Sequence, residues 1–495
     1  MPLKKFQSRA RCMGLLIAAA VATVALPARA AHPDEQPVQH VDRSRTVDAQ
    51  TQLLVHLNNK FIIESPRLPQ NEIPERFEVA VTIDGAARVV SLVRTSVRND
   101  SFHIIAAGEG GKEVFVQPEP ERTYQGSIKG LPDARVAAYL YDNHRISMGI
   151  SIGDERWDVQ PIDALKPGSH VVYQPRDLVG MPVGTCGVHD AVPPAPGGRF
   201  VPRGPGGPTT SKIVIICDCD YEFYGSFSGV QGAINEMQRI INEVNTAYSD
   251  KGICYAVGLF YVRQSNSQNL TPTNADQLLS ALRSFWSQAP YNTDGPVFFH
   301  QVVHLFTYKN LDGSTVGIAY TGTILCQTAP VPTRTDAFSL SSTASFSPDG
   351  EIYPDAHRVE VCAHELGHNW GLRHCDQAAS GCGTNGSTCG IMTSSFDPGS
   401  PGRTAFSACS HNQLVAFRAA YAACAGPCGA SSAAVCLGWC SYESVASANA
   451  SAPVGSTIPI YPYQQSGTTG AWPENITLNR PMTYTAGQAP VRIGH

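Results

Sequence analysis

The chain has 495 residues, more than one hydrophobic core usually organises, so about two to four domains are expected. Its formal net charge is −5, with 36 basic against 41 acidic side chains, and this balance predicts no nucleic-acid partner and no affinity for anionic membranes. The 44 glycines and 36 prolines indicate a protein rich in loops and strands.

The first 30 residues have the layout of a secretory signal peptide. Basic residues from Lys4 to Arg11 precede the apolar run "MGLLIAAAVATVAL", and "PARA" follows, ending at Ala30. The run is short for a bilayer span, so cleavage after Ala30 is favoured over a membrane anchor. We therefore expect a secreted protein without a membrane span, extracellular or, in a Gram-negative bacterium, periplasmic. The 15 cysteines fit export because an oxidising compartment permits disulfides, although the sequence does not reveal their connectivity.

Residues 31–205 are expected to form a mostly β domain. Several stretches alternate apolar and polar residues between Gly, Asp and Pro breaks, which is typical of antiparallel strands. They are "RFEVAVTID", "ARVVSLVRTS", "SFHIIAAG", "KEVFVQP", "ARVAAYLY", "RISMGISIG" and "RWDVQPI". The segment ends in "PPAPGGRFVPRGPGGPTTS", whose composition predicts an exposed linker with Arg199 and Arg203 as candidate cleavage points.

Residues 206–424 alternate strand and helix signals, which predicts an α/β domain with a sheet flanked by helices. "KIVIIC", "ICYAVGLFYVR" and "STVGIAYTG" have the composition of strands, and "ADQLLSALRSFWSQ" that of a helix. A longer helix that ends near Gly252 is predicted from one apolar stripe: Val230, Ile234, Met237, Ile241, Val244 and Tyr248. Residues 425–495 are expected to be a small cysteine-containing extension with a loose tail.

The stretch "AHELGHNWGLRHC" contains three histidines, a glutamate and a glycine at close intervals. His364 and His368 are four residues apart, so a helix places both imidazoles on one face, where they can share a zinc ion. Gly371 allows the chain to leave the helix with a positive φ, and the turn then returns His374 as the third ligand. "YPD" before the helix makes Asp355 its expected N-cap.

This ligand set leaves a fourth coordination position open for water, as a catalytic zinc site requires, and Glu365 can face that water without binding the ion. The simplest alternative is an ordinary helix with core or solvated histidines. In a chain of this composition, however, the pattern is expected by chance only about 10⁻⁴ times. A structural zinc site would need a fourth protein ligand and would have no use for Glu365.

The sequence "HELGHNWGLRH" followed by "CGIM" resembles the signature of the metzincin zinc peptidases, H-E-x-x-H-x-x-G-x-x-H with a downstream Met-turn. "DYEFYGSF", "LDGSTVGIAYTGTILC" and "RTYQGSIKGLPDARVAAYLY" extend the likeness to the adamalysin or reprolysin (ADAM-like) branch, over about residues 120–424. The resemblance implies an α/β metzincin-type catalytic domain with a mixed sheet, an active-site helix and a Met-turn, preceded by a mostly β propeptide domain. It also implies one catalytic Zn2+, whereas a structural Ca2+ cannot be read from the sequence.

Met392 in "GIMTSS" is the expected Met-turn residue, which in that clan forms an apolar floor beneath the zinc. The chain departs from the branch after the third histidine, where Asp is usual: Cys375 stands there, and Asp376 comes one position later. The exact subgroup therefore stays open. Astacin-like and serralysin-like branches place a Tyr two residues after the Met, and Ser394 at that position argues against both.

A second candidate site residue lies before the linker, in "GTCGVHD". Cys186 is the only cysteine between residues 13 and 210. A thiolate is a good fourth zinc ligand and would displace the catalytic water, so Cys186 is a candidate zymogen switch. Propeptides of the resembled branch carry a T-C-G segment at this place. The alternative is a buried cysteine or one that pairs with a downstream partner.

The resemblance implies hydrolysis of peptide bonds by an activated water, with Glu365 as the general base. An extended substrate would add to a sheet edge at residues 315–320, and Thr393 and Ser395 would line the pocket beyond the scissile bond. The edge residues expected nearest the metal are Gly317, Ile318 and Ala319. Protein or peptide substrates, and the chain's own propeptide as inhibitor, are the expected partners.

Two functions from other classes also fit the sequence. One is a secreted binding or toxin-like protein that retains the zinc fold, in which loss of Glu365 would leave the biological effect intact. The other is a zinc amidase, against which the extended-substrate edge argues. A comparison of peptide and amide substrates would decide between the peptidase and the amidase.

Overall fold

The computed structural model describes most of the chain between residues 53 and 421. The described residues are 53–57, 60–69, 73–141, 145–163, 165–188, 210–266, 270–288, 291, 300–324, 337–344, 353–382, 389–397, 405–421, 428 and four short strands within 457–486. The expected signal sequence, the linker with Arg199 and Arg203, and most of residues 425–495 lie outside them. Within the described residues, no helix is long and apolar enough to span a membrane.

The first sheet has eight strands in the order β1-β10-β9-β8-β7-β6-β3-β2, and every neighbouring pair is antiparallel. Alternating apolar side chains of these strands, such as Val79, Val90 and Ile150, form one buried core, which confirms the period-2 pattern. The strand bounds are β1 Ile62–Glu64, β2 Arg76–Ile83, β3 Ala86–Arg94, β6 Thr123–Ile128, β7 Leu131–Leu140, β8 Ile146–Ile152, β9 Glu155–Pro161 and β10 His170–Tyr173.

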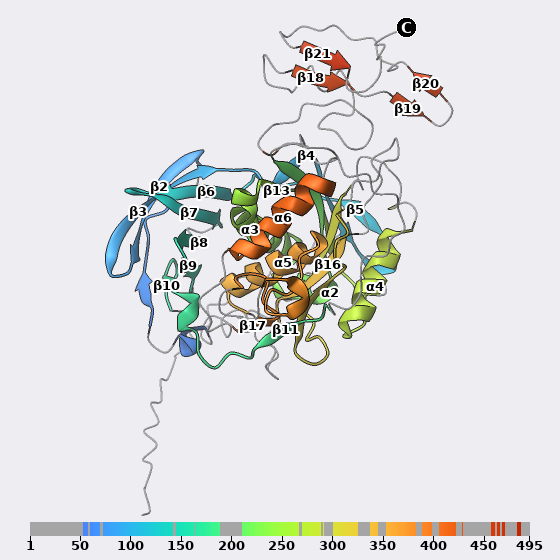
Figure 1. Cartoon of the computed structure of the whole chain (residues 1–495). Helices are drawn as coiled ribbons and strands as arrows, with labels where there is room; N and C mark the ends of the chain where they lie inside the picture. The colour runs from blue at the N-terminus through green and yellow to red at the C-terminus, as the bar shows by residue number, and fades with distance from the viewer. Residues whose placement is uncertain are drawn as a thin grey trace, which may run out of the picture. The chain divides into compact units, whose positions relative to one another are not determined.

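The second sheet has nine strands in the order β17-β11-β15-β16-β14-β12-β13-β4-β5 (Figure 1). Strands β12, β13, β14 and β16 are parallel to their neighbours in this group, and β15 is antiparallel to β16, so the sheet is mixed as expected. Its central strands are β12 Ser211–Cys219, β13 Ile253–Arg263, β14 Val302–Thr307, β15 Thr315–Ala319 and β16 Phe338–Ser342, with the two-residue β17 Ser395–Phe396 at one edge.

Three strands of the second sheet come from the segment expected to form a separate β domain. Strand β4 (Arg98–Ala107) pairs in parallel with β13, β5 (Glu113–Phe115) pairs with β4, and β11 (Gly184–Cys186) lies between β15 and β17. Local alternation could not predict this, because a strand's own residues do not specify which sheet it joins. The N-terminal segment therefore contributes strands on both sides of the second sheet, β4 and β5 at one edge and β11 next to the edge strand β17 at the other.

Helices cover both faces of the nine-stranded sheet, as the sequence predicted. The long helix α3 (Val230–Tyr248) and the motif helix α5 (Asp355–Asn369) pack on one face, and α4 (Ala275–Trp286) packs on the other. The predicted stripe of α3 is confirmed, since Ile234, Met237 and its other members are buried or pack against this core. The helix α2 (Tyr221–Ser226) precedes α3, and α6 (Ala408–Tyr421) lies near the C-terminal end of this region (Figure 1).

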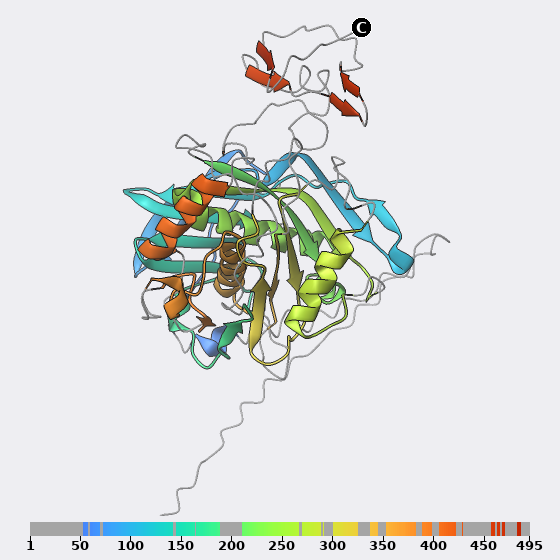
Figure 2. The same cartoon turned by 45° about the vertical axis from the view of Figure 1, so that its right-hand side comes forward.

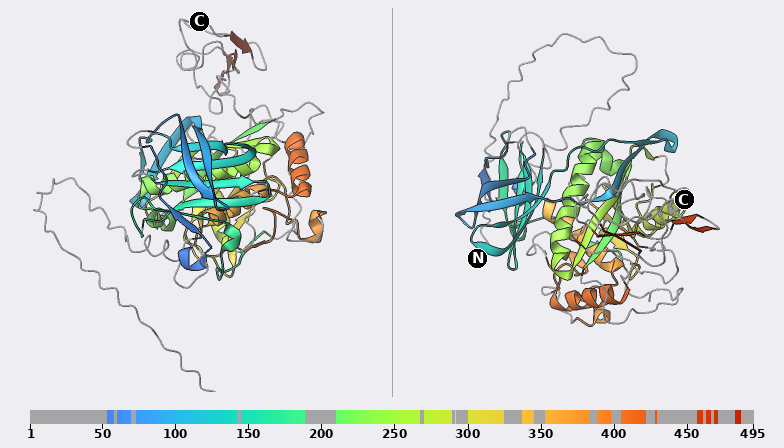
Figure 3. Two further views of the ribbon diagram at one scale, coloured as in Figure 1. Left: turned by 90° about the vertical axis from the view of Figure 1, so that its left-hand side faces the viewer. Right: turned by 90° about the horizontal axis from the view of Figure 1, so that it is seen from above.

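The opposite side of α3 is polar but also buried, because the eight-stranded sheet packs against it (Figure 3). Arg239 pairs with Glu236 and Glu243 along the helix, at 2.6 and 2.7 Å. Arg156 of β9 completes the cluster through Glu243, with 2.6 Å between Nη2 and Oε2. A charged helix face thus meets the first sheet, and an apolar helix face meets the second.

Helix α5 begins one position earlier than the sequence predicted. Its cap residue is Pro354, which has no side-chain hydrogen bond to offer, so the expectation that Asp355 is the N-cap was wrong. Asp355 is the first helical residue; its carboxylate pairs with Arg358 and accepts a 2.6 Å hydrogen bond from Ser147 Oγ of β8. The local pattern predicted that the Asp355 carboxylate caps the helix, but in the structure this carboxylate bonds to Arg358 and Ser147 instead.

Three disulfides are formed among the described residues. Cys375–Cys389 and Cys382–Cys409 tie down the segment that follows the motif helix, and Cys254–Cys428 anchors the start of the C-terminal extension to β13. Cys186 takes part in none of these disulfides and is only partly buried, whereas Cys217, Cys219 and Cys362 are buried thiols in the core. Within the extension, β18 (Thr457–Ile460) pairs with β21 (Thr483–Ala486), and β19 (Tyr463–Gln465) with β20 (Thr468–Gly470).

Candidate metal centre

The motif helix and the turn after it bring three imidazoles together. His364 and His368 project from one face of α5 one turn apart, and Gly371 has φ 81°, which confirms the predicted left-handed exit from the helix. The Nε2 atoms of His364 and His374 lie 2.9 and 3.2 Å from Nε2 of His368. All three rings are essentially buried, at 0 to 1% exposure.

Backbone carbonyls fix which nitrogen of two rings faces the centre. His364 Nδ1 lies 2.7 Å from the Ile391 carbonyl oxygen, and His368 Nδ1 lies 2.7 Å from that of Leu372. A carbonyl only accepts, so each Nδ1 carries the proton and each Nε2 presents a lone pair inward. Burial and the neighbouring His374 lower the pKa of His368 to about 3, so this ring is neutral at physiological pH.

Close lone pairs repel each other unless a cation lies between them, and the spacing suits zinc. Ligand nitrogens about 2.05 Å from a tetrahedral zinc are about 3.3 Å apart, and a zinc-bound sulfur lies about 3.6 Å from such a nitrogen. The three imidazoles and the thiol of Cys186 have ligand atoms that all lie within 4.8 Å of one another. Cys186 Sγ is 3.5 Å from His368 Nε2, so the residues present fit this ion.

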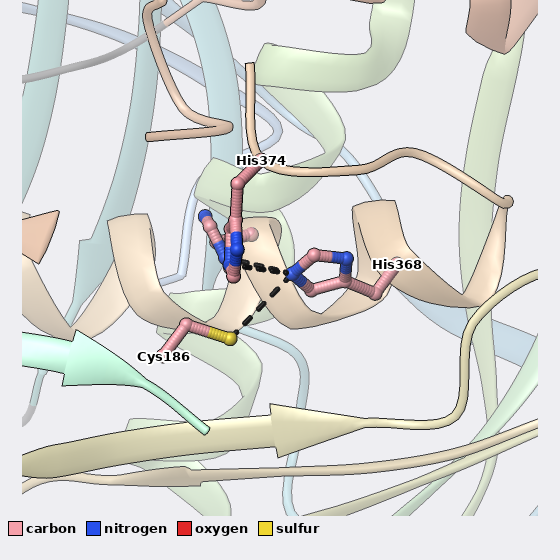
Figure 4. Close-up of side chains that lie close together, drawn as sticks. Cys186, His368 and His374 are labelled. Atoms are coloured by element: carbon pink, nitrogen blue, oxygen red, sulfur yellow. Dashed lines mark hydrogen bonds between the residues drawn. The ribbon is translucent and has the colours of Figure 1, made fainter. Parts of the chain in front are cut away.

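Strand β11 places Cys186 at this centre (Figure 4). The strand lies between β15 and β17, with Cys186 opposite Gly317 and Gly184 opposite Phe396. The sulfur accepts a hydrogen bond from the Val188 amide at 3.3 Å, an interaction that stabilises negative charge on it. A residue 178 positions before the first motif histidine therefore lies beside all three rings, an arrangement that no local sequence pattern encodes.

Glu365 is fully buried beside the imidazoles, and burial raises the pKa of its carboxyl well above the ordinary value. Cys186 Sγ lies 3.7 Å from Oε2, while Oε1 has no hydrogen-bond partner among the described residues. Gly317 of β15 lies directly against this carboxylate: a Cβ there would be 2.5 Å from Oε1. Ile318 and Ala319 continue the same strand and are buried.

Met392 lies on the other side of the motif helix, at 0% exposure. A Cβ on Gly367 would be 2.6 Å from its sulfur, so the thioether packs directly against the helix backbone between the two helical histidines. The adjacent carbonyl of Ile391 is the one that orients His364. The segment that contains Met392 thus packs against the motif helix and orients one of its histidines.

The segment after His374 is held by contacts that the sequence did not reveal. Asp376 accepts hydrogen bonds from Ser394 N and Ser394 Oγ, the second at 2.7 Å, and Cys375 N donates to the Met392 carbonyl at 2.7 Å. With the Cys375–Cys389 disulfide, these contacts tie the third histidine to the chain that leads into β17. The shift of the acidic residue by one position was the visible signal, but its partners are distant in sequence.

Apolar side chains lie on both sides of Cys186. Met181 packs against a buried cluster of Val316, Tyr353, Val361 and Phe396, and Tyr353 Oη donates to the Pro182 carbonyl at 3.4 Å. On the other side, Val188 belongs to the core cluster that includes Ile318 and Ala319. The segment around β11 therefore fills apolar surface before and after the thiol.

Residues 209–407 match a reprolysin model of Metallo-peptidase family M12. The crystal structure of metalloproteinase-II from Bacteroides fragilis is similar, with 11% sequence identity and a TM-score of 0.40, over 70% of this chain and 92% of that chain. The matched region contains the three histidines and Glu365, whereas Cys186 precedes it. Residues 209–407 are thus a reprolysin-like metallopeptidase domain, and the chain is a zinc metalloendopeptidase.

Proposed function

We propose that this chain is a secreted endopeptidase made as a latent precursor, with residues 31–205 as propeptide and inhibitor. The observation that carries the proposal is the position of Cys186, which completes a four-ligand set with His364, His368 and His374. Three protein ligands suit a catalytic zinc site, and a fourth closes it. The latent form thus differs from the active form by one removable thiolate.

The active form uses the three histidines as ligands. When bound there, zinc supplies a Lewis acid that polarises the scissile carbonyl and makes a water at the site more acidic. Glu365 takes the proton of the attacking water at its carboxylate and later passes it to the leaving amine. Its burial beside Gly317 excludes bulk water and keeps the carboxylate oriented towards the reacting bond.

A peptide substrate would take the place that β11 occupies in the precursor. That place lies between the edges of β15 and β17, so an extended peptide can gain main-chain hydrogen bonds on both sides. Gly317, Ile318 and Ala319 would then face the substrate, with Thr393 and Ser395 beyond the scissile bond. The apolar surfaces that Met181 and Val188 cover favour substrates with apolar side chains flanking the cleaved bond.

The two rival functions make different demands on the same site. A binding or toxin-like protein that only retains the zinc fold would have no need of a proton acceptor such as Glu365. A zinc amidase would have no need of a strand-pairing place such as the one that β11 fills, with apolar contacts at Met181 before it and at Val188 after it. The site chemistry and the sequence together support the proposed secretion, the zymogen form and the role of each site residue.

The test is zinc-dependent cleavage of a mixed peptide library and of a muramyl-type amide. Wild type and Glu365→Gln chains would be compared before and after limited proteolysis has removed the residues upstream of 206. We expect peptide cleavage only after removal, loss with a chelator, and a decrease of about 10²-fold or more in Glu365→Gln with zinc content unchanged. Equal turnover in Glu365→Gln would refute the base assignment, and amide cleavage alone would favour the amidase.

A further inference from the structure

The β4–β5 hairpin connects two strands of the N-terminal sheet, yet it lies in the other sheet (Figure 2). Strand β3 ends at Arg94 and β6 begins at Thr123, and both remain in the eight-stranded sheet. Between them the chain crosses to the outer edge of β13, forms β4 and β5, and returns. The hairpin is thus an arm of the N-terminal part that is built into the metallopeptidase sheet.

The pairing with β13 extends over most of the length of that strand. Leu259 to Arg263 lie opposite His103 to Ala107, and Val257 lies opposite Arg98. The amides of Val257 and Gln264 donate to the carbonyls of Val97 and Ala107, at 2.7 and 2.8 Å, so the ladder is closed at both ends.

Side chains of the hairpin enter the core on both faces of the sheet. Val97 and Ile104 belong to the cluster under α3, and Ile105 and Ala107 belong to the cluster under α4; all four are at most 1% exposed. At the end of the hairpin, Glu113 accepts hydrogen bonds from Tyr261, at 2.6 Å, and from Tyr291. The contact has the apolar, close-packed character of a domain interior.

The two other contacts of the N-terminal part have a different character. The eight-stranded sheet meets the polar face of α3, and β11 inserts three residues at the substrate edge. Strands β11 and β4 lie at opposite sides of the sheet, separated by β15, β16, β14, β12 and β13. The described disulfides all join residues after the linker, so within the described chain the attachment is noncovalent.

We propose that the β4–β5 hairpin retains the N-terminal part after the linker has been cut. The hairpin and β11 belong to the same fragment, so β11 stays near its site as long as the hairpin is bound. After it dissociates, β11 therefore rebinds faster than the fragment escapes. A single cut in the linker then yields a nicked complex that is still latent. Release requires a second event in the N-terminal part, namely cleavage of the chain on either side of the hairpin. The proposed retention of the N-terminal part depends only on the contacts of the hairpin, whereas the latency of the nicked complex also rests on the proposed function.

The experiment uses the full chain with a site-specific protease sequence placed between Arg199 and Arg203. After complete cutting, the mixture is diluted and passed through a size-exclusion column, and both association and peptidase activity are measured. We expect the two fragments to co-elute and to remain inactive. Separation of the wild-type fragments immediately after cutting overturns the retention. Co-elution with full activity leaves the retention standing and refutes the latch, so the two ideas fail separately.

Matched variants locate the attachment. In Ile104→Ala/Ile105→Ala the buried side chains of β4 are truncated, whereas in Val114→Ala/Phe115→Ala the truncated side chains of β5 are 52% and 61% exposed in wild type. We expect the first pair to release the cut fragment at least about tenfold faster and the second pair to match wild type. Thermal unfolding of each uncut variant verifies that it is folded. Equal release rates in both pairs would place the attachment elsewhere and overturn the proposal.

Discussion

At the scale of single residues, the candidate metal centre is organised by carbonyl groups rather than by charged side chains. The carbonyls of Ile391 and Leu372 orient His364 and His368, and their positions depend on the turn after the motif helix. Cys186 adds a thiol at 3.5 Å from His368 Nε2 and takes no part in these carbonyl contacts. We therefore expect the histidine set to persist when the thiol is removed.

The first prediction concerns the latch. In Cys186→Ala the strand β11 retains its main-chain pairing but no longer supplies a fourth ligand. We expect measurable peptidase activity in the unprocessed chain, at least about tenfold above wild type. Thr185→Ala, which removes a hydroxyl near Ser314 and a methyl group but no potential metal ligand, is the control and should remain latent. An inert Cys186→Ala chain that still binds one zinc would contradict the switch.

The second prediction concerns a buried histidine outside the centre. His304 lies between Ser339 Oγ and Ser341 Oγ, at 2.8 Å from each, and burial lowers its pKa from 6.5 to about 3. A base with a lowered folded pKa contributes stability above pH 6.5 and loses it as the pH falls towards 3. Over the 1.5 units between pH 6.5 and pH 5, at about 1.4 kcal/mol each, the loss is about 2 kcal/mol.

The measurement is the free energy of unfolding by denaturant at pH 7, 6 and 5. We expect His304→Gln to be less stable at pH 7 but to show a flatter decline towards pH 5 than wild type. His103→Gln, at a partly exposed position of β4, serves as the control for general effects of replacing a histidine. Parallel pH profiles for wild type and His304→Gln would show that His304 does not couple folding to protonation.

At the scale of elements, strand β15 sets the width of the catalytic groove. Its Gly317 allows the strand backbone to approach Glu365, since a Cβ would be 2.5 Å from Oε1 and 2.8 Å from the carboxyl carbon. On the other side of the groove, Asp376 holds the chain that leads to β17. The groove is therefore defined by one glycine and one carboxylate, both outside the motif helix.

The third prediction follows from that approach. The methyl group of Gly317→Ala must displace the Glu365 carboxylate, and a displaced base is misaligned with the reacting bond. We expect kcat to fall by about 10²-fold while zinc content and folding are preserved. Gly225→Ala is a suitable control, because a Cβ at Gly225 has nothing within 4 Å. Wild-type kcat in Gly317→Ala would show that the carboxylate can move without cost.

At the scale of the whole molecule, the N-terminal part contacts the metallopeptidase region in three chemically distinct ways. The β4–β5 hairpin contributes apolar core, β11 contributes the thiol of Cys186 to the candidate metal centre, and β9 contributes the buried cation Arg156 to the polar face of α3. A charged helix face is suited to water, so we expect α3 to tolerate the exposure that release of the eight-stranded sheet would cause. The edge of β13 that pairs with β4 is apolar, so its exposure to water would be unfavourable.

The fourth prediction tests the charged contact. Arg156 has a side-chain exposure of 6% and pairs with Asp158 and Glu243, so Arg156→Ala leaves buried carboxylates with fewer partners. We expect the uncut chain to lose about 3–5 kcal/mol of unfolding free energy. Arg176→Ala breaks the exposed pair with Glu155, at 45% and 50% exposure, and should cost less than about 1 kcal/mol. Equal losses in the two variants would mean that burial does not matter to this pair.

The sequence by itself determined the local features of this protein. The spacing of His364, His368, Gly371 and His374 specified a helix and a left-handed exit, and period-2 and period-3.6 patterns located most strands and helices, because these depend on residues a few positions apart. It also singled out Cys186 by its isolation from other cysteines. Such signals are local, and local backbone geometry suffices to interpret them.

The tertiary structure alone decided how distant segments pair. In the structure β11 lies between β15 and β17, and β4 joins the metallopeptidase sheet. The Asp355 carboxylate bonds to Ser147 and Arg358 and does not cap the helix, and Cys375 pairs with Cys389. For each of these segments many partners elsewhere in the chain are compatible with its own sequence. Which partner it contacts depends on the packing of the whole core. For that reason the residues of the candidate metal centre could be predicted one by one, but not the hairpin that joins the N-terminal part to the second sheet.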